Sequence, residues 1–537
     1  MELTIDGLND RNKWEKAGVS LPSYDIRAVS ERTKKEPLWV HFGAGNIFRM
    51  FIAGLQDTLL NQGDADRGII CAETFGYDII DEIYTPHDNL VLGVTLNADG
   101  TTEKRVIGSL CEAIKSISGE TAEWRRLKEI FASHSLQMVS FTITEKGYAL
   151  YSSDGTFLPS IAKDIEGGLR EPKTAMAQVT ALLHYRFESS KTPIAVVSMD
   201  NCSRNGEKLR AAVLTIATEW QKRGLVSNDF VSWVSDEKTV SFPWTMIDKI
   251  TPRPNAKIGE MLEKSGIEAM KPTVTKNGTY IAPFVNAEKP QYLVIEDSFP
   301  NGRPRLEKAG VYLTDRESVN RVERMKVTTC LNPLHTALAV YGCLLGFDTI
   351  ADEMKDDTLR TLVEKISAEG LAVVTDPKII SPEKFAKEVL CERLPNPFMP
   401  DTPQRIATDT SQKVGIRFGE TIKSYIERDG NAKALTAIPL AIAGWLRYLL
   451  AIKDDGEAFE PSSDPLLSEL QAKLSGIELG KKESCGDKLK AILSSENIFG
   501  VDLYKAGIGE KIEELFLEEI AGVGAVRATL KKHLSLH

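Results

Sequence analysis

The sequence predicts an α/β fold, in which an N-terminal half built on a parallel sheet precedes a mainly α-helical C-terminal half. Residues 38–73 contain, in order, a strand, a glycine turn, a helix and a strand, which is the order of a βαβ unit. Further short apolar runs of strand length follow in the first half. After about residue 318 helical patterns take over and strand patterns nearly vanish. These observations favour two domains of different architecture.

The first half contains several strand candidates. They cover residues 38–42, 68–73, 137–144, 193–199 and 291–295, and a helix is predicted over residues 47–60. Polar turns follow the runs at 137–144 and 193–199, as expected where the carboxyl ends of parallel strands carry functional groups. The polar, proline-containing stretch 251–273 is interpreted as an insertion in this half.

The second half is predicted to be helical throughout. Its helix candidates are residues 332–345, 357–369, 411–427, 434–452, 465–474 and 508–521. The most apolar of them, 434–452, contains Pro439 and Arg447 and is shorter than a clean membrane span, so we expect a buried core helix. A polar segment rich in proline and glycine, 298–305, separates the halves. The predicted domains are therefore residues 1–300 and 301–537.

Composition excludes several classes of protein. The 537 residues include 66 Lys and Arg against 76 Asp and Glu, a net charge of −10, without a basic cluster that would favour nucleic acid. The seven cysteines contain no C-x-x-C pair, so neither a disulfide framework nor a metal site is expected. The polar N-terminus lacks the apolar core of a signal peptide. We therefore expect a cytoplasmic protein with no membrane and no nucleic-acid partner.

The turn Gly43-Ala44-Gly45 points to a dinucleotide. The first glycine permits a tight turn, and the second lets a diphosphate approach the positive end of the following helix. Phe48 stands where a third glycine is usual, so the close packing of helix on strand must be achieved in another way. Glu73 ends the next strand, 28 residues after Gly45, where an acid accepts hydrogen bonds from ribose hydroxyls and repels a 2′-phosphate. The sequence thus predicts a Rossmann-type domain that takes NAD, the alternative being a plain turn and a solvated acid.

A second chemical cluster lies at residues 323–335, at the start of the helical half. Glu323, Lys326, Asn332 and His335 place an acid, a base, an amide and an imidazole within thirteen residues. An amide and an imidazole three residues apart on one helix face can both reach a bound molecule. The alternative is a helix with a solvated lysine and a histidine satisfied in the core.

With these patterns in place, the chain resembles the polyol-specific long-chain dehydrogenases, the mannitol dehydrogenase family. The matching stretches are residues 41–49, 142–147, 198–201 with 205–206, 242–243 with 246–248 and 250–252, 326–335 and 409–413. Within the family, the residues at 326–335 and the length of the chain are most similar to the fructuronate reductases. The resemblance implies a metal-free, NAD-dependent oxidoreductase that interconverts D-fructuronate and D-mannonate, as a monomer or weak homo-oligomer.

Other readings stay open at this point. Tagaturonate reductases and mannitol 2-dehydrogenases of the same family use the same chemistry on other sugar acids or polyols. A dinucleotide-binding regulatory protein without catalytic activity would carry the same cofactor turn. Activity on a panel of ketoses and ketouronates separates these possibilities.

The resemblance also implies roles for individual residues. Lys326 matches the general acid/base, Asn201 and Asn332 the paired asparagines, His335 a substrate-binding histidine, and Glu323 an acid that exchanges protons with solvent. The cofactor-binding set is Gly43, Ala44, Gly45, Asn46, Ile47, Phe48, Glu73 and Glu145, and Asp248 and Lys413 fall in the substrate-binding set.

Arg417 joins the substrate-binding set by its spacing. It lies four residues after Lys413, on the same helical face, so the two could clamp a substrate carboxylate. The alternative is that Lys413 contacts hydroxyls only and that Arg417 pairs with an acid such as Glu420.

One departure from the family pattern concerns spacing. The family places its asparagine five residues and its histidine eight residues after the lysine, whereas here the offsets are six and nine. Pro333 lacks an N–H, and its ring would clash with the carbonyl of Thr329 in an unbroken helix. We therefore predict a one-residue bulge or break between Lys326 and Asn332, with Pro333 starting a helix.

Overall fold

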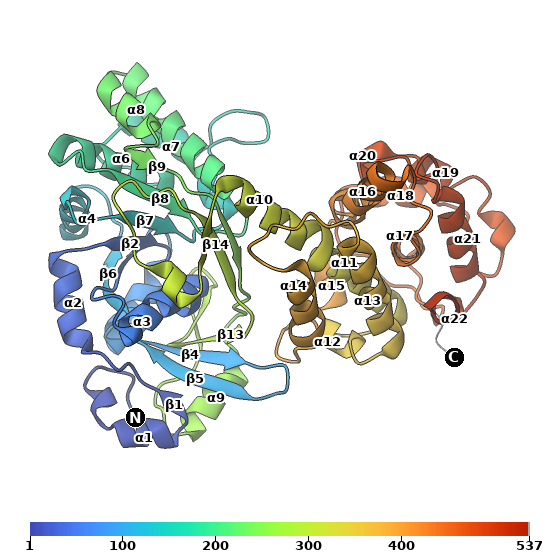
Figure 1. The fold of residues 1–537 in the computed structure, drawn as a ribbon, viewed down its shortest axis with the longest axis horizontal. Coiled ribbons are helices and arrows are strands. Elements are labelled where there is room, and N and C mark those ends of the chain that lie inside the picture. The colour runs from blue at the N-terminus through green and yellow to red at the C-terminus, as the bar shows by residue number, and fades with distance from the viewer. Residues whose placement is uncertain (535–537) are drawn as a thin grey trace. The chain divides into compact units, whose positions relative to one another are not determined.

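The computed structural model describes residues 1–534 and divides into two compact units (Figure 1). Unit 1 comprises Met1–Asn97 and Thr101–Asn320, and unit 2 comprises Ala98–Gly100 and the chain from Arg321 onward. The division along the chain thus follows Asn320, whereas the sequence suggested residue 300.

Unit 1 is built on a six-stranded sheet in which all strands are parallel. Numbered along the chain, its strands have the spatial order 3-2-1-4-5-6, the order of the Rossmann fold. In that spatial order the strands are β6 (Leu110–Lys115), β3 (Ile69–Glu73), β2 (Trp39–Phe42), β7 (Met138–Phe141), β8 (Ile194–Ser198) and β9 (Val240–Ser241). The predicted fold class is confirmed, and four of the predicted strands lie in this sheet.

Helices cover both faces of the sheet, which is why its strands read as continuous apolar runs. Val40 and Phe42 pack into a core with α4, α6, α7 and α8, whereas Trp39 and Met138 face a second core that includes α3. The helices of the unit are α1 (Arg11–Lys16), α2 (Ile26–Lys35), α3 (Ala53–Gln62), α4 (Ala122–Ala132), α5 (Pro159–Gly167), α6 (Ala175–Ser189), α7 (Asn205–Lys222), α8 (Asn228–Ser235) and α9 (Ala256–Lys264).

Three smaller sheets complete unit 1. The predicted strand at 291–295 is present as β14, but it belongs to a separate sheet, antiparallel to β10 and parallel to β15. The stretch 251–273 contains α9 and leads into the hairpin of β11 and β12. The strands are β10 (Thr245–Asp248), β14 (Tyr292–Glu296) and β15 (Tyr312–Thr314); β1 (Val19–Ser20), β5 (Thr102–Ile107), β4 (Val91–Leu96) and β13 (Phe284–Glu288); and β11 (Thr273–Val274) and β12 (Tyr280–Ile281).

Unit 2 is helical, and no strand is assigned among its residues between 321 and 534. Its helix α11 spans the predicted residues 332–345. The elements are α10 (Arg316–Met325, which begins before the unit), α11 (Asn332–Leu345), α12 (Ile350–Glu353), α13 (Asp357–Leu371), α14 (Pro382–Glu388), α15 (Pro403–Ile406), α16 (Glu420–Asp429), α17 (Ala437–Tyr448), α18 (Leu467–Lys473), α19 (Lys490–Leu493), α20 (Glu496–Phe499), α21 (Gly509–Glu519) and α22 (Ala525–Leu534).

The predicted helix at 411–427 is confirmed from Val414 onward, but its first turns are irregular. A 3₁₀ turn at Thr410–Gln412 and a π-helical turn at Gly415–Gly419 precede α16. At the end of the π-turn two backbones approach closely. A Cβ atom on Gly419 would lie 1.9 Å from the carbonyl oxygen of Phe499, so the chain passes the end of α20 at a distance that only glycine permits.

The apolar stretch at 434–452 forms α17, whose side chains are buried, as predicted for a core helix. It contacts α11 and α21. Within residues 1–534, none of the helices combines the length and the apolar character that crossing a bilayer requires.

A buried acid joins three of these helices. The hydroxyl of Tyr341 on α11 lies 2.7 Å from both the Leu440 carbonyl oxygen on α17 and Glu519 Oε1 on α21. One hydroxyl proton cannot serve both acceptors, so the contact is complete only when Glu519 is itself protonated. Burial raises the pKa of the Glu519 carboxyl to about 8, which agrees with this proton count.

This acid makes stability depend on pH. Its carboxyl keeps a proton in the folded state up to about pH 8, while the unfolded chain releases it near 4.5, so stability falls as pH rises between these values. At pH 8 we expect the free energy of unfolding of Glu519→Gln to exceed that of the parent protein by on the order of a few kcal/mol. The variant should therefore unfold at a higher temperature. Near pH 4.5 the two should coincide. Thermal unfolding followed by circular dichroism across this range checks the prediction, and parallel pH profiles would contradict it.

Candidate functional site

The glycine turn of unit 1 opens into a cavity of about 390 Å³. Gly43 has φ +109°, and a Cβ atom on it would lie 2.3 Å from the Thr142 carbonyl oxygen, so glycine is required at the switch point between β2 and β7. A Cβ on Gly45 would meet nothing within 4 Å, because this residue faces the open cavity at the start of the next helix. Close backbone, open space and a helix N-terminus fit the diphosphate of a dinucleotide.

Glu73 lines the same cavity, but its carboxylate is already engaged by the backbone. Oε2 accepts a hydrogen bond from the Ala44 N–H at 2.7 Å, and Oε1 accepts from the N–H groups of Thr74 and Phe75 at 2.8 Å. The side chain therefore ties the loop after β3 to the glycine turn. A carboxylate oxygen has two lone-pair directions, so Oε2 keeps capacity for one ribose hydroxyl.

Phe48 shows how the missing third glycine is replaced. Its ring is fully buried and stacks on the His41 imidazole, with 4.1 Å between the ring centroids and 3° between the planes. His41 is held by Ser140 and Thr142, and burial lowers its pKa well below the usual value, so the ring is neutral. The side chain of Phe48 thus belongs to the core, and only its backbone can serve the cofactor.

A second cavity in unit 1, of about 230 Å³, lies beyond Thr142 and Thr144, which line both cavities. Its wall includes three predicted site residues, Ile47, Glu145 and Asn201. Asp248 is buried at the end of β10 and is not among the lining residues, and the next residue, Lys249, lines the cavity in its place.

Asp200 is a residue of this cavity that sequence reasoning missed. Thr144 has φ 64° and ψ 160°, a backbone conformation that residues other than glycine rarely adopt. Asp200 holds it there, because its carboxylate accepts hydrogen bonds from the Ile143 and Thr144 N–H groups and from the Tyr148 hydroxyl. An acid directly before Asn201 at a strand end was the available signal. Strain held in place beside a predicted site residue is typical of functional sites.

In unit 2, the helix that carries the cluster at residues 323–335 is interrupted where predicted. A π-helical turn covers Lys326–Cys330, and the Leu331 N–H donates across five residues to the Lys326 carbonyl oxygen at 3.1 Å. Leu331 leaves the helical region with φ −127° and ψ −62°, and α11 then begins with Pro333 in its first turn. The predicted extra residue and the helix start at Pro333 are confirmed.

The π-turn corrects the angular position of His335. In an uninterrupted helix, residues nine apart lie about 180° apart around the axis, on opposite faces. Taking up one residue in a π-turn reduces the separation to that of eight residues, about 80°. Lys326 and His335 can therefore serve one side of the helix. Lys326 is 4% exposed, so its stem is packed in the protein.

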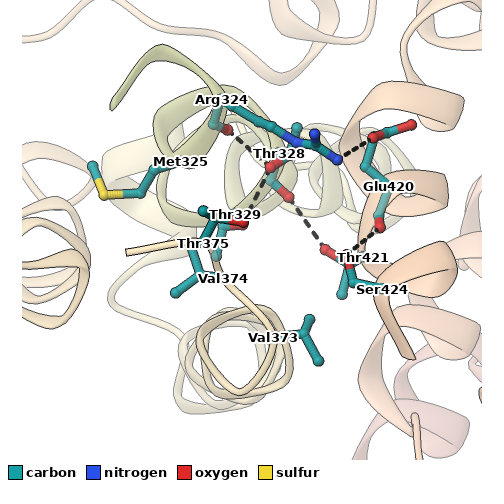
Figure 2. A pocket seen from close by; sticks show the side chains of 10 residues that line it. All are labelled: Arg324, Met325, Thr328, Thr329, Val373, Val374, Thr375, Glu420, Thr421 and Ser424. Carbon is teal, nitrogen blue, oxygen red and sulfur yellow. Dashed lines mark hydrogen bonds and ion pairs between the residues drawn. The ribbon is translucent and has the colours of Figure 1, made fainter. Parts of the chain in front are cut away.

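Threonine side chains form hydrogen bonds to the backbone in and next to the π-turn, around a small cavity of about 20 Å³ (Figure 2). Thr421 on α16 donates to the Thr328 carbonyl oxygen at 3.3 Å, and the Thr328 hydroxyl donates to the Arg324 carbonyl oxygen at 2.8 Å. Arg324 pairs with Glu420 at 2.8 Å across the same cavity. The volume suits about one water molecule. These contacts fix the backbone from which Lys326 projects.

His335 lies in a strongly cationic environment. Burial, followed by the nearby charges of Arg417, Arg405, Arg393 and Lys413, lowers its pKa to about 3. Its Nε2 lies 3.6 Å from Asp401 Oδ2, and Asp401 also pairs with Arg405. His335 is therefore a neutral imidazole above about pH 3, able to orient a substrate hydroxyl.

Arg417 and Lys413 both lie near enough to this histidine for their charges to lower its pKa. The Arg417 N–H donates to the Lys413 carbonyl oxygen at 2.9 Å, so one helical turn separates them. The Arg417 guanidinium donates to the Thr336 hydroxyl, and burial lowers its pKa to about 10. Glu420 instead pairs with Arg324 and Lys423. Within the described residues, no carboxylate pairs with Arg417, and Lys413 donates to the Thr408 carbonyl oxygen.

Comparison with known proteins now gives the family. Residues 38–308 match the mannitol dehydrogenase Rossmann domain, and residues 318–518 match the mannitol dehydrogenase C-terminal domain. The chain belongs to the mannitol dehydrogenase family. A relative from Thermotoga maritima, named D-mannonate oxidoreductase, is 55% identical over 99% of both chains. The expectation of an oxidoreductase of this family is confirmed.

Two solved dehydrogenase structures share the fold. A D-sorbitol dehydrogenase in substrate-free form aligns with a TM-score of 0.78 at 26% identity, covering 96% of this chain and 98% of that chain. A Pseudomonas fluorescens mannitol 2-dehydrogenase aligns with a TM-score of 0.68 at 26% identity, covering both chains completely. That structure is a ternary complex with NAD and D-mannitol, and NAD is the cofactor expected here.

Proposed function

We propose that this chain interconverts D-fructuronate and D-mannonate with NAD(H). Membership of the mannitol dehydrogenase family supports a secondary alcohol or ketone substrate. The name of the Thermotoga maritima relative supports mannonate, and the NAD complex of mannitol 2-dehydrogenase supports the cofactor. The observation that carries the choice of a sugar acid is Arg417, a partly buried guanidinium near His335 without a carboxylate partner in the described part of the chain.

A buried cation without an anion is costly unless a ligand supplies the opposite charge. The carboxylate of a uronate would accept hydrogen bonds from Arg417, and the positive charge of Lys413 lies in the same group. Mannitol and fructose carry no such group. The arrangement therefore favours an acidic open-chain sugar over a neutral polyol.

The proposed chemistry assigns one task to each residue of the cluster. When bound, the reduced nicotinamide supplies a hydride to the ketone carbon. Lys326 donates a proton to the ketone oxygen in reduction and accepts it in oxidation. Asn332 donates an N–H to the developing negative charge on that oxygen, and the resemblance assigns Asn201 the same task. Neutral His335 orients a neighbouring hydroxyl. Glu323, one helical turn before Lys326, exchanges the proton with solvent.

The test is a substrate panel. Oxidation of NADH is followed with D-fructuronate, D-tagaturonate and D-fructose, and reduction of NAD with D-mannonate and D-mannitol. We expect the highest kcat/KM with fructuronate and mannonate. A preference for tagaturonate or fructose would replace this proposal with the corresponding reductase. NADH binding without turnover of any substrate would favour a non-catalytic regulatory protein.

The choice of NAD over NADP is assigned to Glu73. Replacing it with serine removes the charge that repels a 2′-phosphate. The repulsion between two unit charges in contact amounts to about 1 kcal/mol or more. We expect Glu73→Ser to raise the ratio of kcat/KM for NADPH to that for NADH by about 10-fold or more. The ratio is the proper measure, because the lost anchoring of the turn weakens both cofactors alike. An unmodified enzyme that already prefers NADPH would contradict this assignment.

A further inference from the structure

Phe75 has a solvent-exposed aromatic side chain. It is 81% exposed, the highest value among the large apolar side chains of residues 1–534. Single exposed apolar side chains are common on protein surfaces, so the position of this ring matters more than its exposure. The ring lines the cavity of the glycine turn, the one that also contains Glu73.

The backbone beneath the ring is fixed. Glu73 Oε1 accepts the N–H groups of Thr74 and Phe75 at 2.8 Å, and Glu73 Oε2 accepts the Ala44 N–H. The ring is thus carried by a loop that is hydrogen-bonded to the glycine turn. The side chain is exposed although its backbone is held in place.

The turn between β11 and β12 forms another wall of this cavity. Thr275, Asn277, Thr279 and Ile281 line it, and Phe75 is the only aromatic residue among the described residues that do so. The turn is closed by hydrogen bonds between Thr275 and Thr279. The Lys276 N–H donates to Asp78 Oδ2 at 3.2 Å, which joins this turn to the loop that carries Phe75. An apolar ring and a set of hydroxyl and amide groups therefore face one space.

We propose that Phe75 is the platform on which the adenine ring of the dinucleotide stacks, with the β11–β12 turn beside the edge of the base. The inference rests on the proposed cofactor. If Glu73 receives the adenosine ribose, the base attached to that sugar must lie within a few ångströms, and Phe75 is two residues further along the loop. A purine has a flat π-face and a polar rim, which matches a phenyl ring next to threonine and asparagine side chains.

The test compares ligands with and without adenine. Dissociation constants for NADH, AMP and reduced nicotinamide mononucleotide are measured by calorimetry for Phe75→Ala, Phe75→Leu and Phe75→Trp. Loss of a stacking partner should weaken NADH and AMP by the same factor, about 5- to 100-fold in Phe75→Ala. Phe75→Leu should lose part of this affinity, and Phe75→Trp should keep it. The mononucleotide, which lacks adenine, should bind every variant equally.

Tyr185→Ala serves as the matched control, because Tyr185 is an exposed aromatic residue on α6 outside this cavity. It should leave all three constants unchanged. Unchanged AMP binding in Phe75→Ala, or equal weakening of the mononucleotide and NADH, would overturn the proposal. Because AMP binding requires no sugar substrate, this outcome is independent of whether the enzyme reduces fructuronate.

Discussion

Replacing Lys326 with alanine is expected to lower turnover by about 10²–10⁴-fold, the usual contribution of general acid–base catalysis. The reason is that hydride transfer leaves negative charge on the ketone oxygen, and Lys326 is the proposed proton donor to that atom. NADH binding should persist, because the glycine turn and Glu73 lie in unit 1, whereas Lys326 lies in unit 2. Single-turnover kinetics with NADH and fructuronate, together with an NADH binding titration, measure both effects.

Two further variants separate chemistry from structure. Lys326→Arg keeps the positive charge but cannot release a proton at usable pH, so it should be nearly as slow as the alanine variant. Lys387→Ala removes an exposed lysine on α14 and should leave turnover unchanged. Added primary amines should restore part of the activity of Lys326→Ala. Near-normal turnover in Lys326→Ala would remove this lysine from the mechanism.

The second large effect is expected at Arg417. Arg417→Met should raise the KM for fructuronate by about 10²-fold, because truncating one partner of a buried charge pair costs about 2–5 kcal/mol. The KM for fructose, if fructose is turned over, should change little, since fructose has no carboxylate. Lys413→Met should show the same selectivity with a smaller change, because Lys413 is less buried. Steady-state kinetics on both substrates give the comparison.

Thermal unfolding without substrate provides an independent check. Arg417 has no carboxylate partner among the described residues, so its replacement by methionine should leave the stability of the free protein unchanged or raise it. Arg428→Met is the matched control, because Arg428 is exposed on α16 and pairs with Asp429.

In the kinetic comparison, equal losses on fructuronate and fructose would mean that Arg417 positions the sugar chain in general. The carboxylate site would then lie elsewhere.

The fold was predictable where local patterns decide it. The run before Gly43 and the run ending at Glu73 are apolar on both faces, and they form neighbouring strands of a parallel sheet that helices cover on both sides. Pro333 predicted the break in the helix after Lys326, because proline lacks an N–H. In both cases the cause lies within a few residues of the effect.

The remaining features depend on contacts distant in the sequence. The helix predicted at 411–427 contains a π-turn that ends at Gly419 against the backbone of Phe499, and nothing near residue 419 signals that approach. The cationic side chains near His335 come from residues between 393 and 417. Spacing along one helix could predict only that Lys413 and Arg417 lie together. Asp200 was missed because its role depends on the strained backbone of Thr144, 56 residues earlier.

The π-turn at Lys326–Cys330 also bears on how this family tolerates changes in length. A residue inserted in a helix normally rotates everything after it by about 100°, which would turn a substrate-binding face away from the substrate. Here the extra residue is absorbed within one turn, so α11 resumes regular bonding with the His335 N–H donating to the Leu331 carbonyl oxygen at 3.1 Å. An alignment of this segment therefore needs a one-residue gap between Lys326 and Asn332. An ungapped alignment would assign the neighbours Leu331 and Leu334 to the roles of the asparagine and the histidine.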